Sequence, residues 1–306
     1  MLRKKDKILI AGQEGMVGSA IYELVKKKCR IIECKRKDLD FTDYNKVNLF
    51  FKQTKPNIVI NAAGKVGGIF DNSRYPIEYL NTNLSIGFNI LNVAYKQNVK
   101  KVINIGSACI YPKRTKLPIK EEYLLKNYLE KTNEAYAIAK IAVLKLCEYY
   151  NIKKNKDYIS IQPANLYGNN DNFDLESSHV IPALIRKFHE AKIKKNKIIK
   201  IWGNGRVTRD FMHVKDLADA ILFLLNKKTS YSLINIGTGK ETSIINLIKI
   251  IKNISKFNGK VIFDKTKPSG QLRRVLDISR MKKEGWTSKI TLLKGLKSVF
   301  KNYAKN

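Results

Sequence analysis

Three side chains have the types and spacing needed to reduce a carbonyl group: Ser107, Tyr136 and Lys140. Ser107 follows the apolar run 102–106, which is typical of a buried strand. Tyr136 and Lys140 lie four residues apart in a helical pattern, so the phenol and the ammonium share one helix face. We expect the cation to lower the pKa of the phenol below its free value of about 10, so that the phenol exchanges a proton near neutral pH.

A glycine-rich turn near the start of the chain predicts a nucleotide site. Gly12, Gly15 and Gly18 follow the apolar run 7–11 and open a helical pattern. Glycines let the backbone approach a pyrophosphate closely, and the positive end of the helix dipole favours its negative charge. The turn therefore predicts a dinucleotide cofactor, with an ordinary strand–helix turn as the alternative interpretation.

The residues after the second predicted strand, 29–34, bear on the choice between NADPH and NADH. Basic side chains there suit the 2′-phosphate of NADP, whereas an acidic side chain suits the ribose hydroxyl of NAD. Lys35 and Arg36 follow the strand, while Glu14 brings a negative charge close by. The sequence favours NADPH, and a solvated basic loop is the alternative.

A thiol and an imidazole suggest a second chemistry. Cys109 lies two residues past Ser107, so both side chains face one site if the segment is extended. His179 follows a polar loop that could fold back over the same site. A thiolate and a histidine on opposite sides of a keto sugar suit proton removal and return next to a carbonyl. From the residue types alone, a buried cysteine and a structural histidine are the simpler interpretation.

Residues 201–216 combine a glycine turn, an aromatic side chain and two arginines. Arginine is suited to bidentate contact with phosphate. Arg209 is therefore predicted to bind a diphosphate, and an ion pair with Asp210 or Asp216 is the alternative.

Alternating apolar strands and helices must position these groups. The pattern predicts an α/β fold, a Rossmann-type doubly wound parallel sheet with a smaller α/β C-terminal lobe. We expect the cofactor-binding domain to comprise 1–168 with about 205–240 returning to it, and the substrate-binding lobe to comprise about 169–204 and 241–306. The predicted strands are 7–11, 29–34, 57–64, 102–106, 158–164, 198–202, 233–236 and 260–263, and the predicted helices include 81–98, 133–150, 180–192 and 214–226.

Composition bounds the partners. The chain has 306 residues and a net charge of +33, but its lysines are scattered and no finger or RNP-like strand accompanies them. We therefore expect no nucleic-acid partner, although a positive field would attract a polyanionic substrate. No apolar stretch approaches the roughly 20 residues that span a bilayer, so no membrane partner is expected. Four cysteines without paired spacing fit a cytoplasmic protein, and we expect no metal site.

Taken together, the motifs resemble the GDP-L-fucose synthase family, a branch of the extended short-chain dehydrogenase/reductases that act on nucleotide sugars. The matching stretches span almost the whole chain. They are 15–18, 63–69, 107–112, 134–140, 165–173, 178–189 and the pattern WGxGxxxRDFxHVxD at 202–216.

The resemblance implies a bifunctional 3,5-epimerase and 4-reductase that acts with NADP(H) on a GDP-4-keto-6-deoxy-sugar, GDP-4-keto-6-deoxy-mannose in the family. It also implies a homodimer in which two helices of each subunit pack together. Cys109 would be the base at C3 and C5, and His179 the acid on the opposite face. Tyr136 would then protonate the C4 oxygen, with Lys140 tuning it and holding the nicotinamide ribose, and Ser107 orienting the carbonyl.

The family's contact residues can be carried over position by position. The implied cofactor contacts are Gly12, Gly15, Met16, Val17, Gly18, Lys35, Arg36, Ala62, Ala63, Gly106, Lys140, Pro163, Ala164, Asn165 and Leu166. The implied substrate contacts are Asn165, Lys187, Trp202, Arg209, Ser269 and Arg274.

Three departures from the family pattern leave the cofactor preference and the sugar open. Glu14 stands where the family often has an arginine that meets the 2′-phosphate, Lys187 replaces a substrate-contacting arginine, and Ser269 replaces a carboxylate. One alternative is therefore a C4-reductase only, acting on a related GDP-4-keto-6-deoxy sugar such as a heptose. Another is an NADP-sensing binding protein, against which the intact Ser–Tyr–Lys set argues, because a sensor needs no proton donor.

Overall fold

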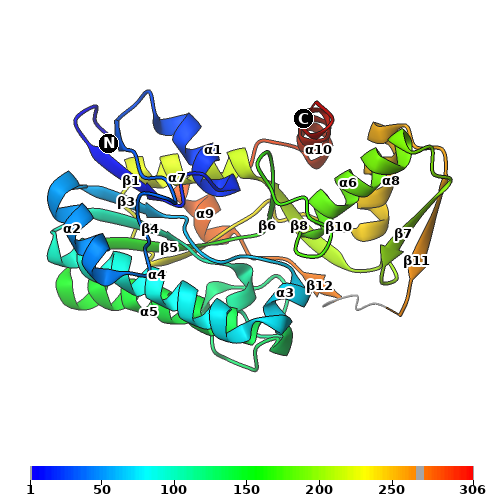
Figure 1. Cartoon of the computed structure of the whole chain (residues 1–306). Helices are drawn as coiled ribbons and strands as arrows, with labels where there is room; N and C mark the ends of the chain where they lie inside the picture. The colour runs from blue at the N-terminus through cyan, green and yellow to red at the C-terminus, as the bar shows by residue number, and fades with distance from the viewer. Residues whose placement is uncertain (1, 267–271, 306) are drawn as a thin grey trace.

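A parallel sheet of six strands, flanked by helices on both faces, forms the larger part of the molecule (Figure 1). The computed structural model describes residues 2–266 and 272–305. The strand order is β2-β1-β3-β4-β5-β9, with every neighbouring pair parallel. Since β2 and β3 lie on opposite sides of β1, the strand order reverses there, and ligands of such sheets bind at the carboxyl ends of the strands at this point. The strands are β1 (Lys7–Ala11), β2 (Arg30–Ile32), β3 (Ile58–Asn61), β4 (Lys101–Ile105), β5 (Asp157–Pro163) and β9 (Leu233–Ile236).

The sheet is buried on both faces, which explains its apolar strands. In β1, Ile8 and Ile10 pack into one hydrophobic cluster, while Leu9 and Ala11 pack into another on the opposite face. Helices α1 and α7 contact each other on the first face, whereas α4 contacts both α2 and α5 on the second. These helices are α1 (Met16–Val25), α2 (Tyr44–Thr54), α4 (Pro76–Lys96), α5 (Glu134–Lys154) and α7 (Val214–Asn226).

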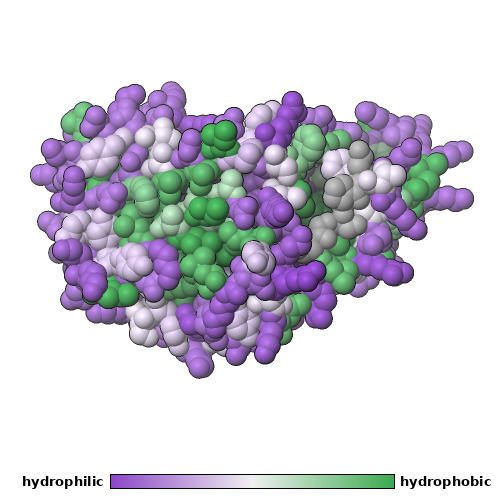
Figure 2. All heavy atoms as spheres, turned by 90° about the horizontal axis from the view of Figure 1, so that it is seen from below, coloured by the Kyte–Doolittle hydropathy of each residue, from purple (hydrophilic) through white to green (hydrophobic). Residues whose placement is uncertain are grey.

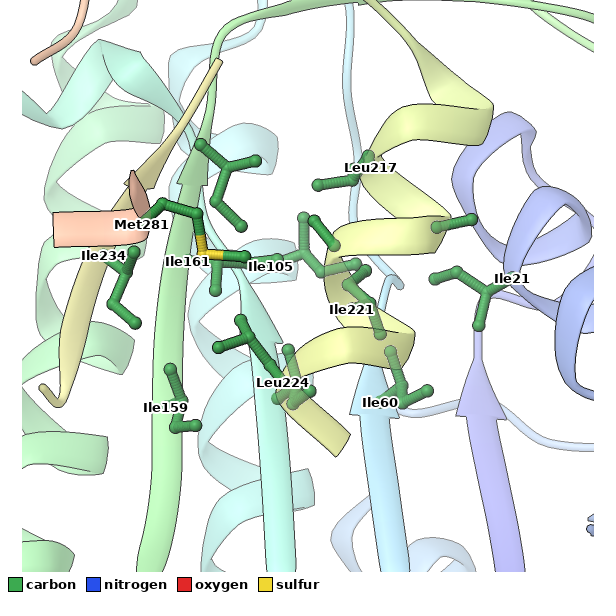
Figure 3. Close-up of a cluster of buried hydrophobic side chains, with 14 of the residues drawn as sticks. Ile21, Ile60, Ile105, Ile159, Ile161, Leu217, Ile221, Leu224, Ile234 and Met281 are labelled. Atoms are coloured by element: carbon green, nitrogen blue, oxygen red, sulfur yellow. The ribbon is translucent and has the colours of Figure 1, made fainter. Parts of the chain in front are cut away.

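Figure 3 shows the first of these clusters at close range. Isoleucines of the central strands point toward Leu217, Ile221 and Leu224 of α7, and Ile21 of α1 joins them. The three α7 residues have no solvent-exposed surface. Packing against α7 therefore holds the central strands, whose carboxyl ends carry the site, in fixed positions.

The remaining elements build a smaller unit beside the sheet. Strand β8 lies between β10 and β12, and β6 also pairs with β8. Helices α6, α8 and α10 supply a third hydrophobic cluster. Strand β8 runs directly into α7, so the chain passes from this unit back to the large sheet. The elements are β6 (Asn165–Tyr167), α6 (Val180–Ile193), β7 (Ile198–Trp202), β8 (Thr208–His213), β10 (Glu241–Ser243), α8 (Ile244–Ser255), β11 (Lys260–Asp264), β12 (Arg273–Arg274), α9 (Ser279–Glu284) and α10 (Leu292–Tyr303).

The predicted fold class is confirmed, and the structure differs at element boundaries and in short elements that were not predicted. The strands predicted at 198–202 and 233–236 and the helix at 214–226 match the structure. The helix predicted from residue 81 begins earlier, at Pro76, because proline fits the first turn of a helix. The short helix α3 (Ile69–Arg74) was not predicted.

Two findings concern the environment of the chain. No helix in 2–266 or 272–305 is long and apolar enough to span a bilayer. Cys29, Cys34, Cys109 and Cys147 are all free thiols.

Candidate active site

The structure brings Ser107, Tyr136 and Lys140 together at the carboxyl end of β4. Ser107 follows this strand, and its hydroxyl is hydrogen-bonded to the phenol of Tyr136. Tyr136 and Lys140 are both buried in the first turns of α5. The Nζ of Lys140 lies 5.6 Å from the centroid of the Tyr136 ring and 3.5 Å from the Ile105 carbonyl oxygen. The predicted carbonyl-reducing set is therefore assembled.

The protonation states differ from the expectation. The pKa of Tyr136 was predicted to fall, but burial raises it, and the hydrogen bond from Ser107 opposes this shift only in part. Burial also lowers the pKa of Lys140 to about 8. Desolvation outweighs the attraction of the cation because both groups lie inside the protein. The phenol is consequently protonated at neutral pH, the form that a proton donor needs.

Cys109 reaches the same site by a different geometry from the one predicted. Residues Ala108–Ile110 form a 3-10 turn rather than an extended segment, so side-chain alternation does not apply. The Ser107 hydroxyl caps this turn by accepting a hydrogen bond from the Cys109 amide at 3.3 Å. The Cys109 thiol interacts electrostatically with Tyr136, Arg209 and Arg274. The thiol thus lies close to the reducing set and to two cations.

The loop before α6 ends at His179, which is the N-terminal cap residue of that helix. The carboxylate of Asp174 accepts hydrogen bonds from the backbone of Glu176 and Ser177 and from the Ser177 hydroxyl. The Ser177 carbonyl in turn accepts from the Gly68 amide at 3.0 Å, which ties the loop to the segment after β3. His179 is exposed to solvent, yet the surrounding protein atoms desolvate its ring enough to lower its pKa.

The glycine turn forms a cradle that side chains would fill. Gly12 has a φ of +80°, and a Cβ there would lie 2.8 Å from the Ala62 carbonyl carbon. A Cβ on Gly18 would lie 2.0 Å from the Gly12 carbonyl oxygen. Helix α1 begins at Met16, with Gly15 as its N-terminal cap, so its free amides point out of this turn. The residues present fit the pyrophosphate of a dinucleotide.

The two acidic residues near the cofactor loop have structural partners. Glu14 accepts a hydrogen bond from the Arg36 amide at 2.8 Å. Glu33 accepts from Gln13 Nε2 at 2.7 Å and from the Tyr22 hydroxyl at 3.1 Å. Both carboxylates therefore fasten the glycine turn to the end of β2, while the Lys35 and Arg36 side chains are exposed.

The other expected cofactor contacts follow neighbouring strands of the sheet. Ala62 and Ala63 come directly after β3, and Gly106 after β4. Pro163 ends β5, and the chain continues through Ala164 into β6. Because the carboxyl ends of parallel strands meet at one edge, these positions lie beside the glycine turn. Met16, Val17, Asn165 and Leu166 complete the expected set at the start of α1 and in β6.

Two arginines far apart in the sequence lie side by side. Arg209 of β8 and Arg274 of β12 are register partners in a parallel pair. Burial lowers the pKa of Arg209 to about 10, and the charge of Arg274 contributes to the same shift. Two partly buried guanidinium groups that repel each other form a strong site for a polyanion. Arg209 stays the predicted diphosphate ligand.

The remaining substrate contacts were expected at three places. Lys187 of α6 donates to the Lys200 carbonyl of β7 at 3.0 Å, and burial lowers its pKa. Trp202 ends the same strand and is half exposed. Ser269 lies outside the described residues. The roles of Lys187 and Trp202 as substrate ligands stay predictions.

Sequence reasoning missed a group of buried polar side chains beneath the site. Asn104, Ser160 and Gln162 are completely buried within β4 and β5. Their signal was present in the sequence as polar residues inside otherwise apolar runs. Buried polar residues of this kind are normally hydrogen-bonded, so a structural role could have been predicted for them from the sequence.

Comparison with known protein families assigns the chain to a family. The family model described as "NAD dependent epimerase/dehydratase family" matches residues 8–237. The chain belongs to this family. Within the NAD dependent epimerase/dehydratase family, GDP-L-fucose synthase 1 of Arabidopsis thaliana is 45% identical over 308 residues, covering 100% of this chain and 95% of that protein.

Solved structures of family members have the same fold. A GDP-6-OMe-4-keto-L-xylo-heptose reductase from C. jejuni superposes with a TM-score of 0.94 at 33% identity, covering 99% of both chains. A GDP-L-fucose synthetase from Naegleria fowleri bound to NADP superposes with a TM-score of 0.93 at 29% identity, covering 100% of this chain and 95% of that one.

Proposed function

We propose that the chain is an NADPH-dependent epimerase/reductase of a GDP-4-keto-6-deoxy-sugar. The observation that carries this proposal is that the Cys109 thiol interacts with Tyr136 and also with the paired arginines. A simple carbonyl reductase needs Ser107, Tyr136 and Lys140, but it needs no thiol beside them. The relatives named GDP-L-fucose synthase support the GDP-sugar as the substrate class.

Each side chain has one task in this reaction. Cys109 removes the protons at C3 and C5, next to the carbonyl, and His179 returns protons on the opposite face. The lowered pKa of His179 makes its protonated form a stronger acid. Tyr136 then donates a proton to the C4 oxygen, which Ser107 orients. Bound NADPH supplies the hydride for C4.

The cofactor is held by the glycine turn and the strand ends described above. Lys35 and Arg36 are proposed to meet the 2′-phosphate; their exposed side chains and the hydrogen bond that holds the Glu14 carboxylate on the Arg36 amide support this role. The NADP-bound family member supports this choice. Lys140 holds the nicotinamide ribose.

The GDP moiety binds on the smaller unit. Arg209 binds the diphosphate, and Trp202, Lys187, Asn165 and Ser269 are proposed as further contacts. Arg274 was expected among these contacts, but its guanidinium donates to the carbonyl oxygens of Ala108 and Tyr111. The domain division at about residues 168 and 240 also stays part of the proposal, with the cofactor on the large sheet and the sugar nucleotide on the smaller unit.

The test is to incubate the enzyme with GDP-4-keto-6-deoxy-mannose and NADPH in deuterated water and to identify the product by NMR. The proposal predicts a reduced sugar that carries deuterium at C3 and C5. The C4-reductase alternative predicts a reduced sugar without deuterium at those carbons. The similarity of the chain to heptose reductases supports this alternative. No NADPH oxidation with either a hexose or a heptose substrate would overturn both.

We also propose a homodimer formed through α4 and α5. Figure 2 shows hydrophobic side chains gathered over this face. On α5, Ile138, Tyr149 and Ile152 are 46%, 57% and 64% exposed and recur at helical spacing, so they form one stripe. An apolar stripe on so highly charged a chain is expected to be covered by a second copy.

Sedimentation tests the dimer. Ile152→Lys is expected to convert a dimer into a monomer because it places a charge in the stripe that the second copy would cover. Leu49→Lys, on the exposed side of α2, is the matched control and should leave the dimer intact. A wild-type protein that sediments as a monomer at micromolar concentration would contradict the proposal.

The free thiols support the cytoplasm as the proposed location of the protein.

A further inference from the structure

The turn that carries the catalytic side chains is held from below by Gln162. The Gln162 Oε1 accepts a hydrogen bond from the Ser107 amide at 2.7 Å. Its Nε2 donates to the Ser160 hydroxyl at 3.1 Å, which fixes the orientation of the amide. A Cβ on Gly106 would lie 2.1 Å from the Gln162 Oε1, so this glycine lets the side chain pass under the turn.

The support continues across the sheet as a chain of buried hydrogen bonds. Asn104 Nδ2 also donates to the Ser160 hydroxyl, at 3.0 Å, and Asn61 Nδ2 donates to Asn104 Oδ1 at 2.9 Å. Three neighbouring strands are therefore tied together by side chains just below the site. Buried polar networks of this kind rigidify their surroundings when their members are paired.

The same turn is held from the other side by Arg274. Its Nη2 donates to the carbonyl oxygens of Ala108 and Tyr111, the latter at 3.0 Å. These carbonyls flank the 3-10 turn, with Cys109 between them. The guanidinium belongs to β12, so the smaller unit directly supports the turn that carries the thiol.

We propose that Gln162 and Arg274 are positioning residues that hold the two ends of the catalytic turn separately. Gln162 sets the position of Ser107 and so acts on reduction. Arg274 sets the position of Cys109 and so acts on proton exchange. The inference rests on the proposed function for its turnover measurements, but not for its test with an alkylating reagent.

The rate of the reduction step tests the role proposed for Gln162. Gln162→Met keeps the side-chain volume but removes the oxygen that accepts the hydrogen bond from the Ser107 amide. We expect kcat for NADPH oxidation to fall about tenfold to a hundredfold, because small misplacements of a catalytic group have effects of that size. The KM for NADPH should be unchanged. Asn104→Leu is the matched control, because it breaks the same buried network without touching Ser107. The control should lose thermal stability and keep its kcat.

The rate of proton exchange with solvent tests the role proposed for Arg274. Arg274→Met is expected to lower deuterium incorporation at C3 about tenfold or more, with a smaller effect on the hydride step. Arg274→Lys keeps the charge but has no planar fork to span two carbonyls, so it should remain defective. A pure substrate ligand would behave differently: its loss would raise KM and slow both steps equally.

A measurement without substrate separates this inference from the proposed function. The rate of Cys109 alkylation by iodoacetamide, followed by mass spectrometry, should change at least threefold or so in Arg274→Met and stay unchanged in Asn104→Leu. The inference is wrong if alkylation is unchanged in Arg274→Met, or if Asn104→Leu lowers kcat as much as Gln162→Met. Absence of turnover in the wild-type protein would instead count against the proposed function, and the alkylation result would still stand.

Discussion

Replacing Tyr136 by phenylalanine is expected to abolish NADPH oxidation by the keto sugar, with a rate at least about 10²- to 10⁴-fold below that of the wild-type protein. The phenol of Tyr136 is hydrogen-bonded to the Ser107 hydroxyl, which places it at the site where the carbonyl is expected. Because burial raises its pKa, the phenol keeps its proton at neutral pH and delivers it to the C4 oxygen when the hydride arrives. Phenylalanine fills the same space without that proton.

The variant also separates the two steps of the reaction. Deuterium should still enter C3 and C5, because Cys109 and His179 are unchanged. Tyr79→Phe is the matched control: its ring lies edge-on to Tyr136 with centroids 6.1 Å apart, and its hydroxyl donates to Asp71 rather than to the site. This control should lose stability and keep most of its turnover. Hydride transfer retained in Tyr136→Phe, measured as NADPH oxidation, would remove the basis of the assignment.

Replacing Cys109 by serine is expected to stop solvent deuterium exchange at C3 and C5, by about 10²-fold or more. A serine hydroxyl has almost the same size as the thiol but is a far weaker acid, so it provides no base near neutral pH. The thiol interacts electrostatically with Arg209 and Arg274, which are expected to bind the substrate or support the turn beside it. The measurement is NMR of the recovered sugar after incubation in deuterated water.

Cys29→Ser is the control for this experiment. The Cys29 thiol is also partly exposed, but it donates to the Val25 carbonyl after α1 and lies away from the catalytic turn. Exchange should be unaffected there. Deuterium incorporated at the wild-type rate by Cys109→Ser would show that another group is the base, and it would leave only the reduction step of the proposal.

The sequence alone predicted the parts of this protein that depend on local order. The glycines at 12, 15 and 18 have the spacing of a phosphate-binding turn, and apolar runs fully buried on two faces predict a parallel sheet. The pair Tyr136 and Lys140 follows from helical periodicity. These features are encoded within a few residues, so their physical basis, backbone sterics and side-chain period, can be recognised without the fold.

Other features depend on residues that only the fold brings together. The 3-10 turn at Ala108–Ile110 replaced the expected extended segment, because its conformation is stabilised by the Ser107 cap and by Arg274 from a distant strand. The pKa of Tyr136 changed in the opposite direction from the prediction, since the amount of burial is a property of the assembled core and not of a helix face.

What the sequence determined by itself is therefore the chemistry: a carbonyl-reducing set, a dinucleotide turn and a thiol two residues from the reducing serine. Tertiary structure decided how these groups are supported and charged. Arg209 and Arg274 became neighbours through strand pairing, and Gln162 reached Ser107 through parallel register between β4 and β5. The physical reason is that electrostatics and hydrogen bonding act over a few ångströms in space, whereas these partners are separated by more than fifty residues along the chain.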